Sequence, residues 1–349
     1  MKILQLLAGY DSAGLFGSIT PLISELRRRG HDVQEAFVPL RTKQIKDVVY
    51  SAERMASVSP QIRASDVVHV HTPTVHLMAA TTGIVPDNVA LVSSRHATGV
   101  PRGEDWRRAY KRTDIIVPVA RYLVQEFYDA GAPAGKLFPV HNGVNLVDYE
   151  GDRTEAKKKL GISPDTVVVG WTGRLSWVKN LRNTFGATAA AIKAAKRPAV
   201  FLVAGAGKEG GRLAALVKEN GWESKVRMLG FLKRPELLEF LPALDIAVHY
   251  SWTEACSVSL IEYLASGAAV IVSPVPGNKE VVGKSGLVVE MTPPALSSGI
   301  RILIDDEIYR RKMQAAARDR ARMFDVSVTA SKMEMAYQMA VERRCGAGA

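Results

Sequence analysis

Residues 246–272 of the chain read IAVHYSWTEACSVSLIEYLASGAAVIV. An apolar run of strand length, Ile246 to His249, leads into a polar loop, Ser251 to Glu254, and then into a helical segment that begins near Ser257 and ends at Gly267. A second apolar run follows at Val270 to Val272. Strand, helix and strand in this order are typical of parallel sheets with helices on both faces, so the stretch favours the α/β class.

The same alternation continues through the rest of the chain. It begins with a strand, Ile3 to Leu7, which is followed by a loop, Gly9 to Gly17, and by a helix that Gly30 ends. We expect at least five strands in a first sheet and a second series of strand–helix units after it. The other strand candidates are Val67 to Val70, Ala90 to Ser93, Ile115 to Val119, Val167 to Trp171, Val200 to Ala204 and Val226 to Leu229.

A chain of 349 residues is long for one domain and comfortable for two. Between about Gly143 and Pro164 the apolar runs stop and charged residues take their place. We therefore predict two α/β domains, residues 1–150 and residues 151–325. A last helical pattern, about residues 326–343, packs either back onto the first domain or onto its own, and the sequence leaves both arrangements open.

The composition is that of a soluble enzyme, with 47% hydrophobic and 23% charged residues. No apolar stretch approaches the roughly 18 residues that a membrane-spanning helix needs, and the apolar run at the start is too short for a signal peptide. Cys256 and Cys345 lack the spacing of a disulfide framework or of a zinc site. These features predict a cytoplasmic protein.

The formal net charge of +11 indicates an anionic partner. A nucleotide, an anionic membrane surface and a nucleic acid would each suit it, and charge alone does not choose among them. The basic residues cluster at Arg27 to Arg29, at Arg107 to Arg112 and at Arg310 to Arg322. Each cluster is also consistent with an ordinary solvated helix face.

Glu254 and Glu262 lie eight positions apart around the start of the predicted helix. Ser257 fits the N-cap position, and the backbone N–H groups after it, together with the positive end of the helix dipole, form a ready site for a phosphate. Ionised carboxylates accept hydrogen bonds from hydroxyls, so Glu254 would face the group on the distal phosphate and Glu262 the hydroxyls of a nucleoside. Two ordinary surface glutamates are the alternative.

The segment from Gly173 to Asn180 directly follows a predicted strand. A glycine turn and two cations after a strand are typical of a phosphate site, where Arg174 would bind two phosphate oxygens and Lys179 would add a point charge. Since the sequence contains no Asp-x-Asp pair, we expect these cations rather than a metal ion to offset the charge of a diphosphate. A surface loop with incidental charges is the alternative.

Together these segments resemble the family 4 retaining glycosyltransferases of the GT-B fold, over nearly the whole chain. The resemblance also includes Leu264 to Ile271, Gly277 to Val282, His141 to Asn145 and Gly230 to Leu232. It implies two Rossmann-like domains that face each other across a cleft. It further implies a hexosyltransferase that moves a sugar, with retention and without a metal or other cofactor, from a nucleoside diphosphate sugar to a hydroxyl of a glycan or lipid-linked acceptor.

The resemblance also implies roles for particular residues. Glu254 would contact the transferred sugar, Glu262 the ribose hydroxyls, and Arg174 and Lys179 the diphosphate. The remaining donor-site residues would be Gly173, Phe231, Leu232, Ser257 and Val258, of which Phe231 and Leu232 belong to the loop that holds the base.

From the first domain the resemblance implies Gly14, in a glycine-rich loop, and His96, in the cleft. His69 and His71 also lie near a strand end, where we favour a structural role. The chain departs from the family pattern at three places, namely Ala13, Ala255-Cys256 and Gly277-Asn278, where glycines or a larger apolar residue are common.

The glycines at 205, 207 and 210 match the spacing of a dinucleotide-binding fingerprint. No acidic residue ends a strand about 20 residues further on, so we reject an NAD site. A sugar-nucleotide epimerase or phosphorylase of the same fold, or a noncatalytic subunit, stays open as a function. The basic first domain suits a glycolipid acceptor at the anionic inner face of a membrane, and we expect no nucleic-acid partner.

Overall fold

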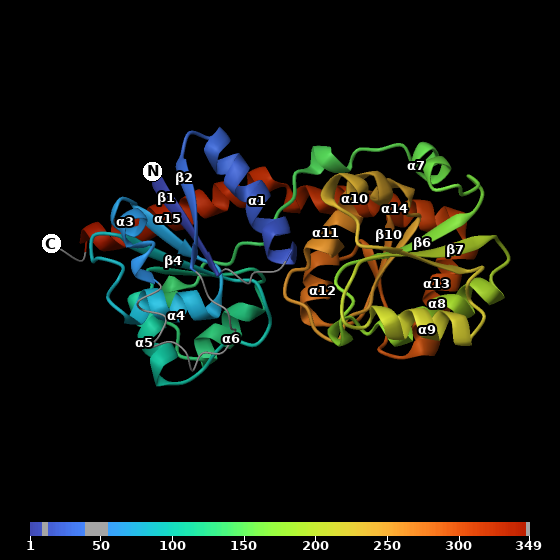
Figure 1. The fold of residues 1–349 in the computed structure, drawn as a ribbon, viewed down its shortest axis with the longest axis horizontal. Helices are drawn as coiled ribbons and strands as arrows, with labels where there is room; N and C mark the ends of the chain where they lie inside the picture. Colours follow the sequence, from blue (N-terminus) through green and yellow to red (C-terminus); the bar gives the residue numbers. More distant parts are fainter. Residues whose placement is uncertain (9–12, 39–54, 347–349) are drawn as a thin grey trace. The chain divides into compact units, whose positions relative to one another are not determined.

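The computed structural model describes residues 1–8, 13–38 and 55–346 (Figure 1). The chain divides into two compact units, one formed by residues 1–144 together with 326–349 and the other by residues 145–325. The sequence placed the boundary at residue 150, whereas the structure divides after Val144. The last helix, α15 (Val326–Gly346), belongs to unit 1 although it comes at the end of the chain.

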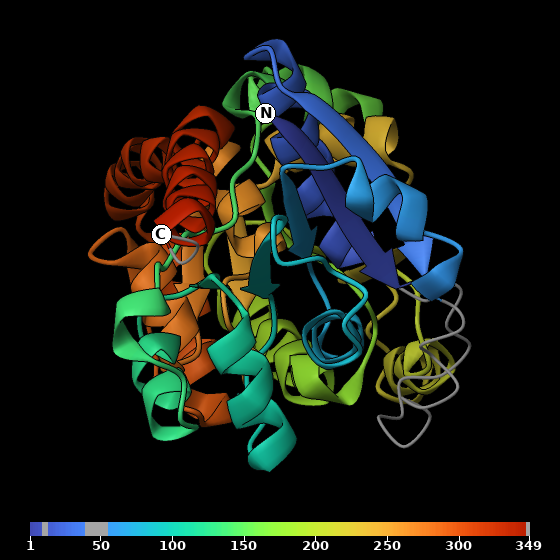
Figure 2. The same cartoon turned by 90° about the vertical axis from the view of Figure 1, so that its left-hand side faces the viewer.

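Unit 1 is built on a five-stranded parallel sheet with the order β2-β1-β3-β4-β5. Figure 2 shows this sheet with the blue strands β1 and β2 toward the viewer. The strands are β1 (Lys2–Ala8), β2 (Asp32–Val38), β3 (Val67–Val70), β4 (Ala90–Arg95) and β5 (Ile115–Pro118).

Helices cover both faces of the unit 1 sheet. On one face α1 and α15 lie side by side, and residues such as Ile23 and Tyr337 pack with the strands into one buried cluster. On the other face α3 and α4 contribute Ile62 and Met78 to a second cluster. The remaining bounds are α1 (Ala13–Arg28), α3 (Ser59–Arg63), α4 (Pro73–Thr81), α5 (Glu104–Arg112), α6 (Leu123–Asp129) and the 3₁₀ turn η2 (Ala134–Lys136).

Unit 2 carries a six-stranded parallel sheet with the order β11-β10-β9-β6-β7-β8. From β6 the chain moves outward through β7 and β8, then returns to place β9 on the other side of β6. The strands are β6 (Val167–Thr172), β7 (Ala199–Ala204), β8 (Val226–Gly230), β9 (Ile246–His249), β10 (Ala269–Val272) and β11 (Gly286–Val288).

The helices of unit 2 pack on both sides of its sheet, with α8, α9 and α13 on one side and α10 and α14 on the other (Figure 1). The helices are α7 (Arg153–Lys159), α8 (Leu181–Ala194), α9 (Gly210–Glu219), α10 (Arg234–Phe240), α11 (Val258–Ala265), α12 (Pro276–Val282), α13 (Pro293–Asp305) and α14 (Glu307–Ala321). The 3₁₀ turns are η3 (Leu146–Tyr149), η4 (Trp177–Lys179), η5 (Leu241–Ala243) and η6 (Arg322–Phe324).

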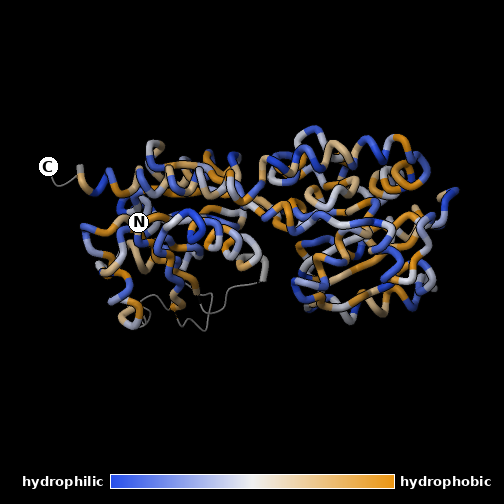
Figure 3. Tube along the Cα trace, turned by 90° about the horizontal axis from the view of Figure 1, so that it is seen from above, coloured by the Kyte–Doolittle hydropathy of each residue, from blue (hydrophilic) through white to orange (hydrophobic). Residues whose placement is uncertain are grey.

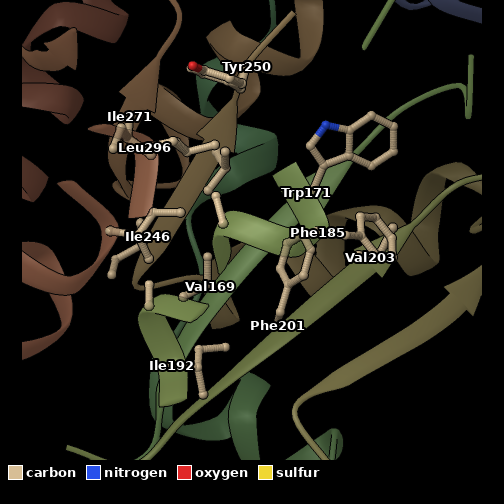
Figure 4. Close-up of a cluster of buried hydrophobic side chains, with 14 of the residues drawn as sticks. Val169, Trp171, Phe185, Ile192, Phe201, Val203, Ile246, Tyr250, Ile271 and Leu296 are labelled. Atoms are coloured by element: carbon tan, nitrogen blue, oxygen red, sulfur yellow. The ribbon is translucent and has the colours of Figure 1, made fainter. Parts of the chain in front are cut away.

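A buried cluster joins the unit 2 sheet to α8, α9 and α13 (Figure 4). Phe185 of α8 and Phe201 of β7 meet edge to face within it, with ring centroids 5.3 Å apart. Figure 3 shows apolar and polar residues alternating along the helices, as expected for helices that bury one face. This packing holds the strand ends, and therefore the loops that follow them, in fixed positions.

Two sequence expectations were wrong. The expected loop from Gly9 to Gly17 is already helical at residues 13–17, which belong to α1, while residues 9–12 lie outside the described part of the chain. Arg310, expected in a surface cluster, is buried and donates to the carbonyl oxygens of Leu303 and Ile304 at the end of α13. Within the described residues no helix has both the length and the apolar character needed to cross a membrane.

Candidate functional site

The candidate site of unit 2 lies where the strand order reverses, between β6 and β9. These two strands are neighbours, with Val169 opposite Ile246 and Gly170 opposite Ala247, but their connections to the rest of the sheet run in opposite directions. In open parallel sheets the loops at the carboxyl ends of two such strands diverge and leave room for a ligand. The loop after β6 carries Arg174 and Lys179, and the loop after β9 carries Glu254.

The loop after β6 is built against the loop after β7. Gly173 has a φ of +146° and donates from its backbone to Ala204, while Leu175 donates to Ala206. A Cβ atom on Gly205 would collide with the carbonyl oxygen of Gly173, so only glycine permits this contact. Gly205 therefore serves to pack the loop after β7 against the loop after β6, which is a structural reason for this glycine that does not involve a dinucleotide.

Arg174 and Lys179 have different surroundings. Arg174 is exposed and forms no ion pair with any residue in the described ranges, so its guanidinium is available to an anion. Lys179 is only 19% exposed, and its Nζ lies 2.5 Å from Oε1 of Glu254. The two cations that we expected to act together on a diphosphate therefore differ, because Lys179 is already paired to a carboxylate.

Glu254 is held by two donors at one oxygen. Besides Lys179, the ring of His249 approaches, with Nε2 3.1 Å from Oε1 of Glu254. Burial opposes ionisation of Glu254, but the hydrogen bond from His249 and the positive charge of Lys179 outweigh it and hold the pKa of this carboxyl below its usual range. Burial lowers the pKa of His249 despite the neighbouring carboxylate, so the ring is neutral at pH 7 and donates through its Nε2–H.

Three further contacts fix the backbone of the Glu254 loop. Trp252 donates from its backbone N–H to the carbonyl oxygen of Val178, which ties the loop to η4. Ser273 Oγ donates to the carbonyl oxygen of Ser251 at 2.7 Å. Gly277 of α12 lies so close that a Cβ atom there would collide with the carbonyl oxygens of Glu254 and Ala255. The glycine of the Gly277-Asn278 pair is therefore required by packing.

Helix α11 begins directly after this loop. Ser257 occupies its N-cap with extended backbone angles, φ −70° and ψ 123°, but its side chain makes no capping hydrogen bond. The first helical hydrogen bond runs from the N–H of Ile261 to the carbonyl oxygen of Ser257, so the amides of Val258 and the next two residues precede the helical ladder. These amides and the positive end of the helix dipole are the groups at which the sequence predicts an anion site.

Glu262 is a buried carboxylate on α11 with two partners that the sequence did not reveal. Oε1 accepts from Nη1 of Arg234 at 2.5 Å and from Oη of Tyr149 at 3.0 Å. The guanidinium of Arg234 also lies over the Tyr149 ring, 5.3 Å from its centroid. Burial raises the pKa of Glu262, and the charge of Arg234 acts in the opposite direction. Both partners bind the same oxygen, Oε1.

Phe231 and Leu232, the expected base-binding residues, follow β8. Phe231 is 64% exposed, which is unusual for a large apolar side chain and leaves its ring open to a ligand. Arg234, two residues beyond Leu232, links this loop to Glu262. Residues from the ends of β6, β8 and β9 and from the start of α11 therefore lie at the same edge of the unit 2 sheet.

The other two predicted site residues, Gly14 and His96, belong to unit 1. Gly14 lies in the first turns of α1, and its surroundings are outside the described part of the structure. His96 follows β4, with its Nε2 3.1 Å from Nδ1 of His71 and its Nδ1 3.2 Å from Oδ1 of Asn142. Both ring nitrogens of His96 are engaged, so a ligand that contacts either nitrogen must replace one of these partners.

His69 and His71 lie deeper in the same network. His71 Nε2 is 2.7 Å from Oε1 of Gln5, whose amide donates to Oη of Tyr337. His69 lies between Oη of Tyr337 and Oγ of Ser94, at 2.8 and 2.7 Å. Burial lowers the pKa of His69 to about 3 and that of His96 to about 4, and it lowers the pKa of His71 well below the usual value. These histidines are therefore neutral at pH 7.

Sequence reasoning missed His249, Arg234 and Tyr149 as members of the site. His249 had a usable signal, because a polar residue ends an otherwise apolar strand at the sheet edge where ligands bind. Arg234 and Tyr149 had none, since only the fold brings them to Glu262 from positions 28 and 113 residues away.

Two family models match the chain, "Glycosyl transferases group 1" over residues 152–320 and "Glycosyltransferase Family 4" over residues 18–148. The two matches lie in succession along the chain and together take in both sheets. This chain belongs to the group 1 and family 4 glycosyltransferases. The family expected from the sequence is confirmed.

Similar proteins agree with this membership. N-acetyl-alpha-D-glucosaminyl L-malate synthase of Bacillus anthracis is 25% identical over an aligned length of 374 residues, gaps included, which covers 97% of each chain. Among solved structures, Anabaena HepE in complex with UDP has a TM-score of 0.78 at 19% identity, over 96% of this chain and 99% of that one. Sucrose-phosphate synthase of Thermosynechococcus elongatus has a TM-score of 0.83 at 17% identity over the whole of both chains. Two Rossmann-like domains of the GT-B type are thereby confirmed as the fold.

The buried histidines of this glycosyltransferase predict how its stability depends on pH. His76, buried beside Thr113, also has a pKa lowered by burial, to about 3. An unfolded histidine takes up a proton below pH 6.5, whereas this folded one stays neutral until the pH nears 3, so stability is fully present above pH 6.5 and lost as the pH falls. When the pH falls from 7 to 5, each such histidine should lower the free energy of unfolding by about 2 kcal/mol.

We expect His76→Leu to reduce the loss of unfolding free energy between pH 7 and pH 5 by that amount, as measured by urea denaturation at both pH values. Thr113→Val is the matched control, because it removes the hydrogen-bond partner of His76 but no titratable group. An unchanged pH dependence in His76→Leu would contradict a buried neutral histidine at this position.

Proposed function

We propose that the chain is a retaining hexosyltransferase that moves a sugar from a nucleoside diphosphate sugar to a hydroxyl of a glycan or lipid-linked acceptor, without a metal ion or other cofactor. The observation that carries the proposal is the arrangement at the β6/β9 edge. Arg174, which has no ion pair among the described residues, and a helix start at Ser257 accompany a carboxylate, Glu254, that two donors hold in place.

The donor is supported by the chemistry of that edge and by a related structure. HepE was also solved with UDP-glucose. In our proposal the diphosphate binds the first amides of α11 at Ser257 and Val258, together with Arg174 and Gly173. The ribose meets Glu262, and the base lies on the loop of Phe231 and Leu232.

The transferred sugar meets Glu254 in this proposal. As the bond between the anomeric carbon and the diphosphate oxygen breaks, negative charge grows on the diphosphate, where Arg174 and the start of α11 stabilise it. The acceptor oxygen forms its bond to the anomeric carbon on the same face, and its proton passes to the departing phosphate oxygen. Lys179 holds Glu254 and adds positive charge beside the diphosphate, and His96 of unit 1 stays a predicted donor contact.

No observation favours the two other functions that the sequence left open, an epimerase or phosphorylase and a noncatalytic subunit. Both would share the fold. The epimerase or phosphorylase would differ in its products, and the noncatalytic subunit would have no turnover to lose when Glu254 is replaced.

Nucleotide binding tests the donor site. In the presence of EDTA we expect one of UDP, GDP or ADP, but not NAD, to raise the midpoint of thermal unfolding by several degrees, because a ligand at about 100 times its dissociation constant stabilises by roughly 2.7 kcal/mol. Glu262→Ala and Arg174→Ala should each reduce that shift. Glu239→Ala is the control, since Glu239 is exposed on α10 and its one ion pair within the described ranges is with Lys159. A response to NAD alone, or loss of the response in EDTA, would overturn the proposal.

We propose further that unit 1 contacts an anionic membrane through α5. Arg107, Arg108 and Lys111 are exposed on this helix, whereas Arg29 is paired with Glu25 and Glu334. Sedimentation with phosphatidylserine-containing vesicles should pull down the protein at low salt, and replacing the three residues with alanine should abolish it. The same triple replacement at Arg311, Lys312 and Arg318 is the control of equal charge. Equal binding to neutral vesicles would exclude the proposal.

A further inference from the structure

His249 is a fully buried histidine to which neither the sequence nor the resemblance gave a role. It is the last residue of β9, and its side chain is 1% exposed. Its Nε2 faces Glu254, while its Nδ1 is buried without a hydrogen-bond partner among the described residues. Burial keeps the ring neutral, so the one N–H that it carries is the one that points at Glu254.

A buried polar atom without a partner is rare in folded proteins, because it loses its hydrogen bonds to water and gains nothing in return. An aliphatic residue at position 249 would continue the apolar strand Ile246 to Val248 and would avoid this cost. The histidine is therefore explained by what its other nitrogen does, which is to donate to Glu254.

The contact with His249 completes a rigid support for one carboxylate. Lys179 reaches Glu254 on a long flexible side chain, whereas the His249 ring is anchored in the sheet by a short one. The two donors meet at a single oxygen, Oε1, and hold it in position. The loop backbone is held by Ser273 and Gly277, so the side chain and the main chain of Glu254 are both restrained.

We propose that His249 is a positioning residue for the transferred sugar: its Nε2–H orients the Glu254 carboxylate so that this group meets the sugar hydroxyls without first reorganising. The inference rests on the proposed function, in which the ligand of Glu254 is the donor sugar. It predicts that His249 affects recognition of the sugar and leaves recognition of the nucleoside diphosphate alone, because the diphosphate and nucleoside contact other residues.

Calorimetric titration of paired ligands tests this role. UDP and UDP-glucose are used, or GDP with GDP-mannose or ADP with ADP-glucose if thermal unfolding selects that base. In His249→Leu the dissociation constant of the nucleotide sugar should rise about tenfold, as expected for loss of one hydrogen bond to a charged group, while that of the nucleoside diphosphate stays the same. In His249→Gln, whose amide N–H can reach the same carboxylate, the ratio of the two constants should return to within about threefold of the wild type.

Two further variants separate positioning from a general loosening of the sheet. Val248→Ala removes buried volume from the same strand without touching Glu254, and it should leave the ratio unchanged. His249→Asn keeps a polar side chain that is too short to reach Glu254, and it replaces the leucine variant if that variant does not fold. Circular dichroism and the thermal midpoint establish that each variant is folded.

The outcomes distinguish failure of the positioning role of His249 from failure of the proposed function. If the wild type binds none of the three ligand pairs, the proposed function fails and the role of His249 fails with it. If the wild type binds a pair but His249→Leu weakens the binding of both ligands equally, or of neither, the donor site stands and the positioning role is wrong.

Discussion

The hydrogen bonds that converge on Oε1 of Glu254 are the interactions on which the candidate site depends. Lys179 comes from the loop after β6 and His249 from the end of β9, so one carboxylate joins the two strands at which the sheet order reverses. The register of β6 against β9 sets the distance between these loops. The packing of Phe185, Phe201 and their neighbours keeps that register in place. The site is thus a consequence of strand order as much as of its own side chains.

The two glutamates of the site show how burial and partners separate chemically identical groups. The partners of Glu254 overcome burial and hold its pKa low, which suits the proposed role of an ionised acceptor for sugar hydroxyls. For Glu262 burial is the stronger effect and raises the pKa, while the charge of Arg234 and the hydrogen bond that it donates act in the opposite direction. A nucleoside bound at Glu262 would therefore meet a carboxylate whose charge is already shared with a protein cation.

The apolar runs of the parallel strands made the fold class and most strands predictable, because strands buried on both faces leave a continuous hydrophobic signal. The edge strand β2 was not predicted from the sequence, since its exposed residues interrupt that hydrophobic signal. The positions of Glu254 and Arg174 in loops that follow strands were also predictable from the sequence. The pairing of Lys179 with Glu254, and of Arg234 with Glu262, could not be predicted from the sequence. Contacts between loops that are distant in sequence depend on strand order, and local sequence patterns do not encode strand order. Gly277 was noted only as a departure from a common glycine pair, and the need for glycine there became clear once α12 lay against the Glu254 carbonyl.

The most direct test of the account follows the anomeric proton of the sugar by NMR while the full chain acts, in EDTA, on the nucleoside diphosphate sugar that it binds, with water as the acceptor. Retaining transfer assisted by Arg174 and the start of α11 predicts that the first sugar released keeps the α configuration of an α-linked donor, and that Arg174→Ala slows its release. Release of the β anomer first, or turnover that appears only when a divalent metal is restored, would contradict the account.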